Sequence, residues 1–480
     1  MMAKAIVGSD FIESDEKITV NDPSNGQKLA EIPNLGIDAV KNAIDVAHES
    51  LPKLQGITIS ARSSLLLAAA VRIREGAASL ALTMTSEIGR PIKNSRGEIL
   101  RTASIFELAA TEVRRAFEGE FVPLESYDYP AGNEKRFALI KREPIGVVGS
   151  ITPFNFPSSS FAHKVAPALA VGNTVVHKPT VFAPLTQLAL AKILLDVGFP
   201  AGSINVVTGS SSMIGEEFVR NPKVGLISFT GSEKVGLDLA GRAIQQGKRV
   251  IMELGGSDAE IVLEDADLAK AAAAAALGRF DYAGQFCNAT KRLIVRKEVT
   301  DSFTDSVVNR MKSMKVGDPR KEETDIGPLI SEEAVKSMEQ FLADAKSGGG
   351  EVVYQGESPS SGFFFPPTIV RTTKPLRIME EEVFGPIVPV MSTETDEEAV
   401  TMANYSPYGL DASIFSKDFS RAYKLASRLK VGSVIINDTT RLRWDNLPFG
   451  GVKKSGIGRE SVRDTMREMT ETKIIAYNFG

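Results

Sequence analysis

The sequence is poor in the residues that bind metals or close disulfides. It has one cysteine, Cys287, and three histidines in 480 residues. One thiol cannot close an internal disulfide or supply a cysteine-rich zinc site, and the three histidines, His48, His163 and His177, show no ligand spacing. The sequence therefore predicts no structural metal.

Long apolar stretches and an excess of positive charge are also missing. No run of about 18 apolar residues occurs, and the first residues lack the basic start and apolar stretch of a signal peptide. The 56 basic residues are outnumbered by 60 acidic ones, for a net charge of -4, whereas a nucleic-acid-binding surface would need a basic excess. We therefore expect a cytoplasmic protein without a nucleic-acid or membrane partner.

What the sequence does contain is the alternation of an α/β protein. A chain of 480 residues exceeds one hydrophobic core, so two or three domains are expected. From residue 146 to 253, short β-branched runs alternate with longer Ala-rich stretches, which is typical of a doubly wound nucleotide-binding sheet. A second block of the same kind follows, through residues 429–440, and predicts another α/β domain.

Three segments fit neither block. Residues 124–143 and 470–480 contain alternating strand candidates that could pair at a sheet edge and join subunits. Residues 346–367 are rich in Gly, Ser and Pro and predict a surface loop.

The lone cysteine lies in a polar setting. A flexible Ala-Gly-Gln sequence comes shortly before Cys287, and Asn288 and Thr290 follow it. An accessible thiol of this kind suits a nucleophile, whereas a cysteine taken alone is more often a buried core residue. Other residues have to decide between these interpretations.

Two polar residues stand where predicted strands end. Glu253 closes an apolar run and precedes a Leu-Gly-Gly sequence, so its carboxylate could act as a general base; the simpler interpretation is an exposed glutamate. Asn155 lies between two Phe-Pro pairs, where a stiff loop would hold its amide as an oxyanion donor; the simpler interpretation is a turn residue.

Two further features suit a nucleotide. Lys178 ends a predicted strand, where an inward-pointing lysine is costly unless it meets an anion or a ribose hydroxyl; otherwise it is a solvated strand end. Gly231 and Ser232 precede a predicted helix, whose free N–H groups favour phosphate, although the same pair also serves in ordinary capping.

Together, and in this order along the chain, the motifs resemble those of the aldehyde dehydrogenase superfamily, from about residue 21 to about residue 468. The motifs that carry the resemblance are TPFNFP, HKP, FTGSEKVG, MELGG, GQFCNATKR, EEVFGP and PFGGVKKSGIGRE. The resemblance implies an α/β fold with two doubly wound domains, a small bridging β element and assembly into a homodimer or homotetramer. It also implies the following parts: a cofactor-binding domain over 1–124 and 146–252, a catalytic domain over 253–431, a return segment over 432–465, and oligomerisation strands over 125–145 and 466–480.

The resemblance implies NAD(P)-dependent oxidation of an aldehyde to a carboxylic acid. Cys287 matches the nucleophile that forms a thiohemiacetal, and Asn155, with the Cys287 backbone N–H, matches the oxyanion donors. Glu253 matches the base that activates water to hydrolyse the thioester. Relatives that pass the acyl group to coenzyme A typically lack this glutamate, so hydrolysis to the free acid is expected.

The same match assigns the cofactor contacts. Glu382 and Phe384 resemble the pair that holds the nicotinamide ribose and packs beside the ring, while Lys178 and Ser232 match the adenosine-ribose and pyrophosphate contacts. Val181 stands where many NAD-preferring relatives carry a glutamate, so NADP is the expected preference, with NAD possible. The full predicted set is Thr152, Pro153, Phe154, Lys178, Thr180, Val181, Gly231, Ser232, Leu254, Gly255, Glu382 and Phe384.

Residues 434–473 bear on the substrate. It looks similar to the branch with lactaldehyde, glyceraldehyde and non-phosphorylating glyceraldehyde-3-phosphate dehydrogenases, which implies a small hydroxyaldehyde. Phosphate-handling members place an arginine before the cysteine, where this chain has Phe286, although Arg441 or Arg443 could contact an anion. An aromatic lining would also accept apolar or aromatic aldehydes. The predicted pocket walls are Phe156, His163, Phe286, Asn288 and Trp444.

Three other functions would give the sequence different requirements. A Cys-Glu-Lys amidohydrolase would need no nicotinamide, and the Gly-Ser turn and the EEVFGP motif speak against it. A cysteine phosphatase would need arginine six positions after the thiol, where Leu293 stands. A non-catalytic relative would be expected to lose the nucleophile or the base, and both are present.

Replacing the thiol tests the assigned nucleophile. Cys287→Ser should abolish turnover and leave cofactor binding intact, because an unactivated hydroxyl is a much weaker nucleophile than a thiolate. The measurement is reduced-cofactor formation beside a cofactor-binding titration. Retained turnover would overturn the assignment.

Overall fold

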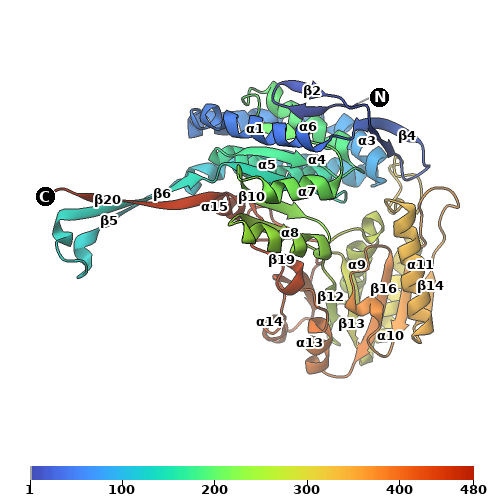
Figure 1. Cartoon of the computed structure of the whole chain (residues 1–480). Coiled ribbons are helices and arrows are strands. Elements are labelled where there is room, and N and C mark those ends of the chain that lie inside the picture. The colour runs from blue at the N-terminus through green and yellow to red at the C-terminus, as the bar shows by residue number, and fades with distance from the viewer. Residues whose placement is uncertain (1–2) are drawn as a thin grey trace.

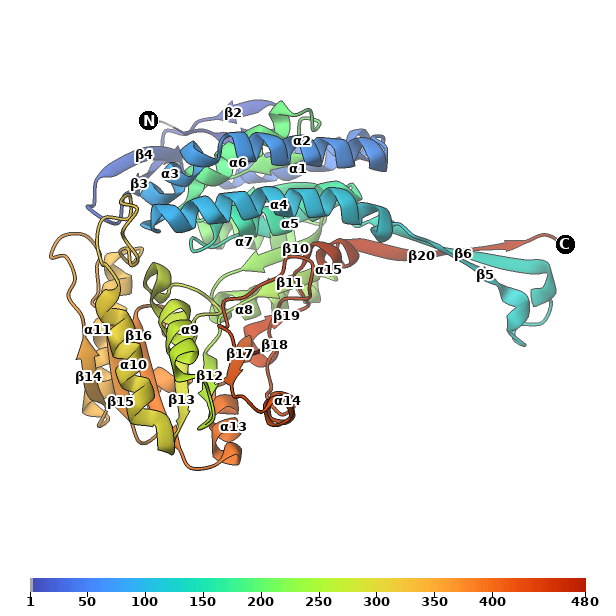
Figure 2. The ribbon, with the colours of Figure 1, turned by 180° about the vertical axis from the view of Figure 1, so that it is seen from behind.

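The computed structural model describes residues 3–480 and consists of two α/β bodies and a long β arm (Figure 1). We call them the first body, the second body and the arm. The first body carries the N-terminus, the second body lies against it, and the arm projects away from both with the C-terminus at its tip (Figures 1 and 2).

The first body is built on a mixed sheet. Its central strands β11, β10, β7, β8 and β9 are parallel, and antiparallel strands border them on both sides. In spatial order the strands are β19 Gly456–Ile457, β11 Arg249–Glu253, β10 Val224–Thr230, β7 Val147–Ile151, β8 Thr174–Lys178, β9 Ile204–Val206, β1 Ala5–Val7 and β2 Asp10–Ile12.

Helices cover both faces of this sheet, because its strands are apolar on both sides. Val148 and Leu226 pack into the core on one face, and their neighbours Val147 and Ile227 pack into the core on the other. The first face is covered by α2 Ile59–Glu75, α3 Ala77–Ile88, α4 Ile92–Ala116, α5 Pro157–Val171, α6 Pro184–Asp196 and α15 Val462–Glu468. The second face is covered by α1 Ile37–Gln55, α7 Ser211–Arg220 and α8 Glu233–Gln245.

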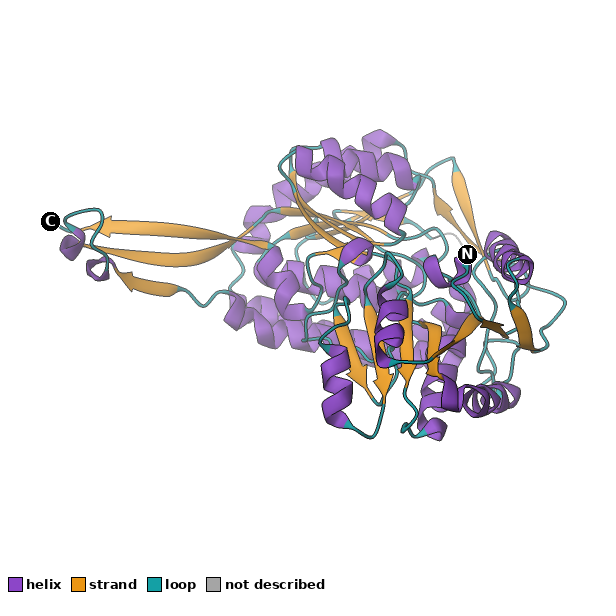
Figure 3. Cartoon of the chain, turned by 90° about the horizontal axis from the view of Figure 1, so that it is seen from below, coloured by secondary structure: helices purple, strands orange, loops and turns teal. Residues whose placement is uncertain are grey.

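The second body repeats this plan around a sheet that is parallel except at β14 (Figure 3). In spatial order its strands are β14 Glu351–Gln355, β15 Thr368–Thr372, β16 Ile387–Thr393, β13 Thr290–Arg296, β12 Asp258–Val262, β17 Asp411–Phe415 and β18 Ser433–Ile436. Its α-helices are α9 Leu268–Phe280, α10 Thr300–Ser313, α11 Glu332–Ser347, α12 Arg377–Glu380, α13 Asp396–Asn404 and α14 Phe419–Ala426.

One predicted loop is a strand. Residues 346–367 include β14, which pairs antiparallel with β15 through Val352 and Val370. The expectation of a continuous surface loop was wrong because the short apolar run is flanked on both sides by Gly, Ser and Pro, and only pairing with β15 makes it a strand.

The arm is an antiparallel sheet of segments distant in sequence. Strand β6, Arg136–Pro144, pairs along its whole length with β20, Thr470–Asn478, and on its other side with β5, Glu120–Pro123. The arm thus begins upstream of residue 125. A separate hairpin joins β3 Lys17–Asn21 to β4 Lys28–Pro33. The short 3-10 turns are η1 Leu124–Ser126, η2 Asn133–Lys135, η3 Asp281–Gly284, η4 Lys297–Val299 and η5 Lys453–Ser455.

Within residues 3–480, no single helix is long and apolar enough to cross a membrane. Helices α1 and α2 meet that length and composition only when taken together, and they are bent by 115° at the break between them.

Polar residues lie at the strand ends and on the loops where the two bodies meet. Parallel strands bring their carboxyl ends to one edge, and in the first body that edge carries Asn155 after β7, Lys178 on β8 and Glu253 on β11. Cys287 comes just before β13 and so lies at the amino end of a strand in the second body. The junction of the bodies is therefore where the predicted site residues converge.

Candidate active site

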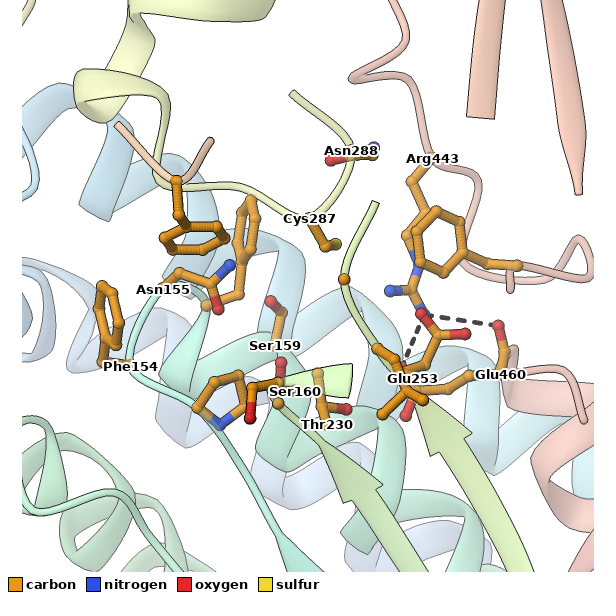
Figure 4. A pocket seen from close by; sticks show the side chains of 18 of the residues that line it. Phe154, Asn155, Ser159, Ser160, Thr230, Glu253, Cys287, Asn288, Arg443 and Glu460 are labelled. Atoms are coloured by element: carbon orange, nitrogen blue, oxygen red, sulfur yellow. Dashed lines mark hydrogen bonds and ion pairs between the residues drawn. The ribbon is translucent and has the colours of Figure 1, made fainter. Parts of the chain in front are cut away.

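A cavity of about 300 Å³ lies at this junction. It takes residues from both bodies and from the return segment that follows β18 (Figure 4). The lining residues are Arg101, Pro153, Phe154, Asn155, Phe156, Ser159, Ser160, Thr230, Gly231, Ser232, Glu253, Leu254, Gly255, Cys287, Asn288, Glu382, Phe384, Arg441, Arg443, Phe449 and Glu460.

Three of the lining residues are the predicted nucleophile, oxyanion donor and base. Asn155 comes from the loop between β7 and α5, Glu253 from the end of β11, and Cys287 from the turn before β13 (Figure 4). The loop that holds Asn155 is stiffened by Pro157, which begins α5 at a position where its missing N–H costs nothing. Three segments distant in sequence thus present a thiol, an amide and a carboxylate to one space.

Cys287 is half-buried, and its environment disfavours the thiolate. Burial and the nearby carboxylates of Glu253 and Glu382 raise the pKa of the Cys287 thiol, and the Lys291 ammonium opposes them. Lys291 also donates from Nζ to the carbonyl of Phe286 at 2.8 Å and to that of Cys287, so it fixes the backbone on which the thiol stands. At neutral pH the thiol therefore needs a proton acceptor in the cavity before it can act as a nucleophile.

Glu253 lies in the same cavity and is the candidate base for the water that hydrolyses the thioester. It is buried, and no group among residues 3–480 donates a hydrogen bond to its carboxylate. Burial raises the pKa of Glu253 and the charge of Glu460 raises it further, while Arg443 and Lys164 lower it. A carboxylate with a raised pKa is a stronger base near neutrality than a solvated one.

Glu460 is held beside Glu253 by two cations. It accepts from Lys164 Nζ at 2.6 Å and from Arg443 Nη2 at 3.0 Å, the latter visible in Figure 4. These neighbours overcome the effect of burial and keep the pKa of Glu460 low. Glu460 is therefore ionised, and its charge works against ionisation of Glu253.

Asn155 has a free amide. Its side chain is buried, and within the described residues it makes no hydrogen bond, so both N–H groups remain available to an oxygen in the cavity. An unpaired buried donor is costly unless a ligand satisfies it, which fits the role of an oxyanion donor.

The nicotinamide end of the predicted cofactor site is assembled around Glu382. Its Oε1 accepts from the Gly256 backbone N–H at 3.0 Å and lies 3.3 Å from Lys291 Nζ. A Cβ on Gly255 would stand 2.2 Å from Glu382 Oε2, so a larger residue there would displace this carboxylate. Phe384 packs edge-on to Phe154, with ring centres 5.9 Å apart. A flat aromatic group and a ribose hydroxyl fit these partners.

The adenosine end lies at the carboxyl end of β8. Lys178 is buried and donates from Nζ to the Ser211 hydroxyl at 2.6 Å. Burial lowers the pKa of Lys178 to about 8, and no ion pair involving it occurs in the described chain. Thr180 and Val181 follow at partly exposed positions. A buried ammonium with a hydroxyl partner and no carboxylate suits an anionic or hydroxylated ligand.

The predicted phosphate turn has the form that close backbone approach requires. A Cβ on Gly231 would stand 2.6 Å from Phe229 Cζ. Ser232 begins α8 in an extended conformation, and within the described range its side chain makes no capping bond, so the first N–H groups of the helix stay open.

Several predicted residues lie away from the cavity wall. Among the described residues, the predicted site residues that do not line it are Thr152, His163, Lys178, Thr180, Val181, Phe286 and Trp444. His163 is buried, its Nε2 lies 3.0 Å from Asp445 Oδ1, and burial lowers its pKa to about 4. Trp444 is 55% exposed. Phe286 packs behind the wall against Phe156, with ring centres 5.2 Å apart.

The wall of the cavity contains arginines and a glutamate instead. Arg101 had no signal in the sequence, because it is one polar residue among many on the long helix α4. Glu460 lies inside a motif that carried the family resemblance, but nothing in its immediate sequence distinguishes it. Arg441 and Arg443, considered as anion contacts, do line the cavity.

A model of the aldehyde dehydrogenase family matches residues 11–475. The chain belongs to the aldehyde dehydrogenase family. It is 39% identical over 464 residues to the lactaldehyde dehydrogenase of Methanocaldococcus jannaschii, which covers 96% of this chain and 97% of the relative. It is 36% identical over 474 residues to the NADP(+) succinate-semialdehyde dehydrogenase of Escherichia coli, which covers 98% of this chain and 96% of the relative.

Solved structures of this family have the same fold. The NADP-dependent glyceraldehyde-3-phosphate dehydrogenase from Bacillus halodurans, complexed with NADP, superposes with a TM-score of 0.96 at 35% identity and covers 100% of both chains. The family, the enzyme class and the α/β fold predicted from the sequence are confirmed. Membership of the aldehyde dehydrogenase family decides against the amidohydrolase alternative.

Removing the carboxylate beside the thiol tests its role as base. In Glu253→Gln the first half of the reaction should proceed and acyl-enzyme should accumulate, so that steady turnover falls by about 100-fold or more after a single burst of reduced cofactor. In the wild type, lowering the pH through the raised pKa of Glu253 protonates the base, so acyl-enzyme hydrolysis should slow as the pH falls.

Stopped-flow absorbance of the reduced cofactor measures both effects. The matched control is Glu217→Gln, because Glu217 is also buried but lies on α7 and bonds Asn221 at 2.8 Å, away from the cavity. Undiminished steady turnover in Glu253→Gln would place the base elsewhere.

Proposed function

We propose that this aldehyde dehydrogenase oxidises a small hydroxyaldehyde, such as glyceraldehyde or lactaldehyde, to the carboxylic acid with NADP as the preferred cofactor and NAD as a second. The observation that carries the proposal is the convergence of Cys287, Asn155 and Glu253 on one small cavity that is also lined by arginines.

The chemistry follows from that convergence. The Cys287 sulfur adds to the aldehyde carbon, its proton passes to a base in the cavity, and the Asn155 amide with the Cys287 backbone N–H stabilises the oxyanion. The nicotinamide cofactor, when bound, accepts the hydride that leaves this carbon. A thioester on Cys287 results. Glu253 then takes a proton from water, the water oxygen adds to the thioester carbon, and the C–S bond breaks to release the acid and the Cys287 thiolate, which takes up the proton from Glu253.

Paired arginines favour a polar, uncharged substrate. Arg101 is paired with Asp445 at 2.6 Å, Arg441 with Asp281, and Arg443 with Glu460 at 3.0 Å. Their charges are thus compensated, while each guanidinium carries five N–H groups and keeps donors free for a substrate hydroxyl. This supports a hydroxyaldehyde over an apolar aldehyde.

The same arginines support a second candidate, glyceraldehyde 3-phosphate. Three guanidinium groups on one cavity wall offer bidentate contacts to a phosphate, and a solved relative of this fold is a glyceraldehyde-3-phosphate dehydrogenase. Because a phosphate would have to compete with three carboxylates already in place, we rank it second.

A panel of aldehydes separates the candidates. The purified enzyme is assayed for reduced-cofactor formation with lactaldehyde, glyceraldehyde, glyceraldehyde 3-phosphate, benzaldehyde and propanal, the last being lactaldehyde without its hydroxyl. We expect kcat/KM for lactaldehyde to exceed that for propanal by about tenfold or more, because buried donors left unpaired penalise the analogue. Equal values would contradict a hydroxyl-binding pocket, and a preference for the phosphate would select the second candidate.

The cofactor preference rests on the surroundings of Lys178. A 2'-phosphate on the adenosine ribose would meet the Lys178 ammonium and the Ser211 hydroxyl beside the N-terminus of α7, with no carboxylate at Val181. The NADP in the complex of the Bacillus halodurans relative is consistent with this preference.

A charge at position 181 should reverse the preference. In Val181→Glu a like charge near the 2'-phosphate would cost about 1–4 kcal/mol, so the ratio of kcat/KM for NADP over NAD should fall by about tenfold or more. Val181→Gln is the control, because it has the size of glutamate without its charge. The same ratio in both variants would show that charge is not the cause.

The arm supports the proposal that the enzyme is a homodimer or homotetramer. Its strands carry exposed apolar side chains, among them Phe121, Ile474 and Tyr477, and the outer edge of β20 is unpaired within the described chain. We further propose the domain limits given above, with the arm taken to begin at Glu120, and a cytoplasmic location.

A further inference from the structure

One buried arginine connects the two loops that carry the nucleophile and the oxyanion donor. Arg90 follows α3 and its guanidinium lies 4.6 Å from the ring centre of Phe156 and 5.7 Å from that of Phe286. Phe156 directly follows Asn155, and Phe286 directly precedes Cys287. Arg90 therefore packs on the residue next to each of the two catalytic groups.

The two phenylalanines also pack on each other. Their ring centres are 5.2 Å apart, and Arg90 and Phe286 are buried there, while Phe156 also lines the cavity. A cation over aromatic rings in such a desolvated place contributes more than one at the surface. The Arg90 Nη1 also donates to the backbone carbonyl of Asn155 at 3.4 Å.

The counter-ion of Arg90 fixes the helix that follows Asn155. Glu98 on α4 pairs with Arg90 through one oxygen. Its other oxygen accepts from the Ser158 and Ser159 N–H groups at 3.1 Å and 3.2 Å, and from the Ser158 hydroxyl at 2.9 Å. These are the open N–H groups in the first turn of α5, two residues after the end of the Asn155 loop.

Neither side chain lines the cavity among the described residues, so neither can touch the substrate. A buried ion pair is costly to desolvate, and replacing one with apolar groups is often neutral for stability. Arg90 and Glu98 instead contact the Asn155 loop, the N-terminus of α5 and the ring of Phe286, which precedes Cys287.

We propose that Arg90 and Glu98 are a positioning pair that sets the distance between the Asn155 amide and the Cys287 thiol. This rests on the proposed function, because it assumes that both groups act on the same carbonyl. A donor moved by about 1 Å at a reacting centre can cost about 100-fold in rate. The pair therefore acts on the steps that place an oxyanion at the Asn155 amide, which are thiohemiacetal formation and the addition of water to the thioester, and leaves cofactor binding unchanged.

The experiment compares Arg90→Met, Arg90→Lys and Glu98→Gln with matched controls. Arg62→Met removes a buried arginine that donates to the Ala170 carbonyl at 2.9 Å, and Glu87→Gln alters a buried carboxylate that accepts from the Thr186 N–H at 3.0 Å at the start of α6. Both controls have the burial of the tested residues and lie away from the two loops.

The readout is the rate constant of the pre-steady-state burst of NADPH with lactaldehyde, normalised to Cys287 thiols counted by titration. Affinity for NADP and the melting temperature are measured beside it. A merely structural residue lowers the melting temperature or the number of active sites, but leaves the burst rate constant per intact site unchanged.

We expect Arg90→Met to lower the burst rate constant by about 10- to 100-fold, with NADP affinity unchanged. Arg90→Lys should recover part of it, because the charge remains but the flat stacking group is lost. Glu98→Gln should show a smaller loss in the same step. The two controls should stay within about twofold of the wild type in burst rate constant.

Three outcomes would overturn the proposal. The first is a folded Arg90→Met or Glu98→Gln enzyme that bursts at the wild-type rate, and the second is an equal loss in the two controls. The third is that neither Arg90→Met nor Glu98→Gln folds, which would make the pair purely structural. If the wild type forms no NADPH at all with lactaldehyde, the proposed function is overturned, and this proposal with it.

Discussion

The site depends on how closely two stretches of backbone approach each other at the junction of the bodies. A Cβ on Gly256 would stand 2.6 Å from the Cys287 carbonyl oxygen, and one on Gly255 would stand 2.2 Å from a carboxylate oxygen of Glu382. Two successive glycines after Glu253 therefore let the strand that ends in the base run past the turn that holds the thiol. Larger residues there would push the base and the thiol apart, whatever else in the cavity stayed intact.

The second constraint on the site is burial, which removes water from its ionisable groups. Burial raises the pKa of both Cys287 and Glu253, so it disfavours the thiolate and the carboxylate, which are the reactive forms. The cations nearby have partners of their own: Lys291 contacts two backbone carbonyls and Glu382, and Lys164 contacts Glu460. A substrate or cofactor that changes the charge in the cavity therefore changes how readily both groups ionise.

The parts of the site that could be predicted from the sequence are those that follow β-strands. Glu253 and Lys178 end apolar runs whose length and composition mark them as strands, and the topology of a parallel sheet then places their side chains at one edge. Residues that act from helices carry no such mark. Arg101 and Glu98 repeat with the period of α4 and look like any polar residue of an amphipathic helix.

The burial of individual side chains is the second property of the site that could not be predicted from the sequence. Whether His163 or Trp444 faces a cavity depends on segments hundreds of residues away, such as the partner Asp445 that holds His163 behind the wall. The strand β14 could not be predicted for a similar reason. Its flanks have the composition of a loop, and it is a strand because it pairs with β15. Sequence patterns report local structure, and these features are decided by tertiary contacts.

The return segment has a consequence for how the protein is made. Arg443, Phe449 and Glu460 line the cavity, and the same stretch of chain goes on through α15 into β20 at the tip of the arm. A chain still growing on the ribosome already contains Cys287 before the part of the cavity wall formed by Arg443, Phe449 and Glu460 has been made. The reactive thiol is thus present before its cavity is closed, and the cavity is complete only once the return segment has folded back against both bodies.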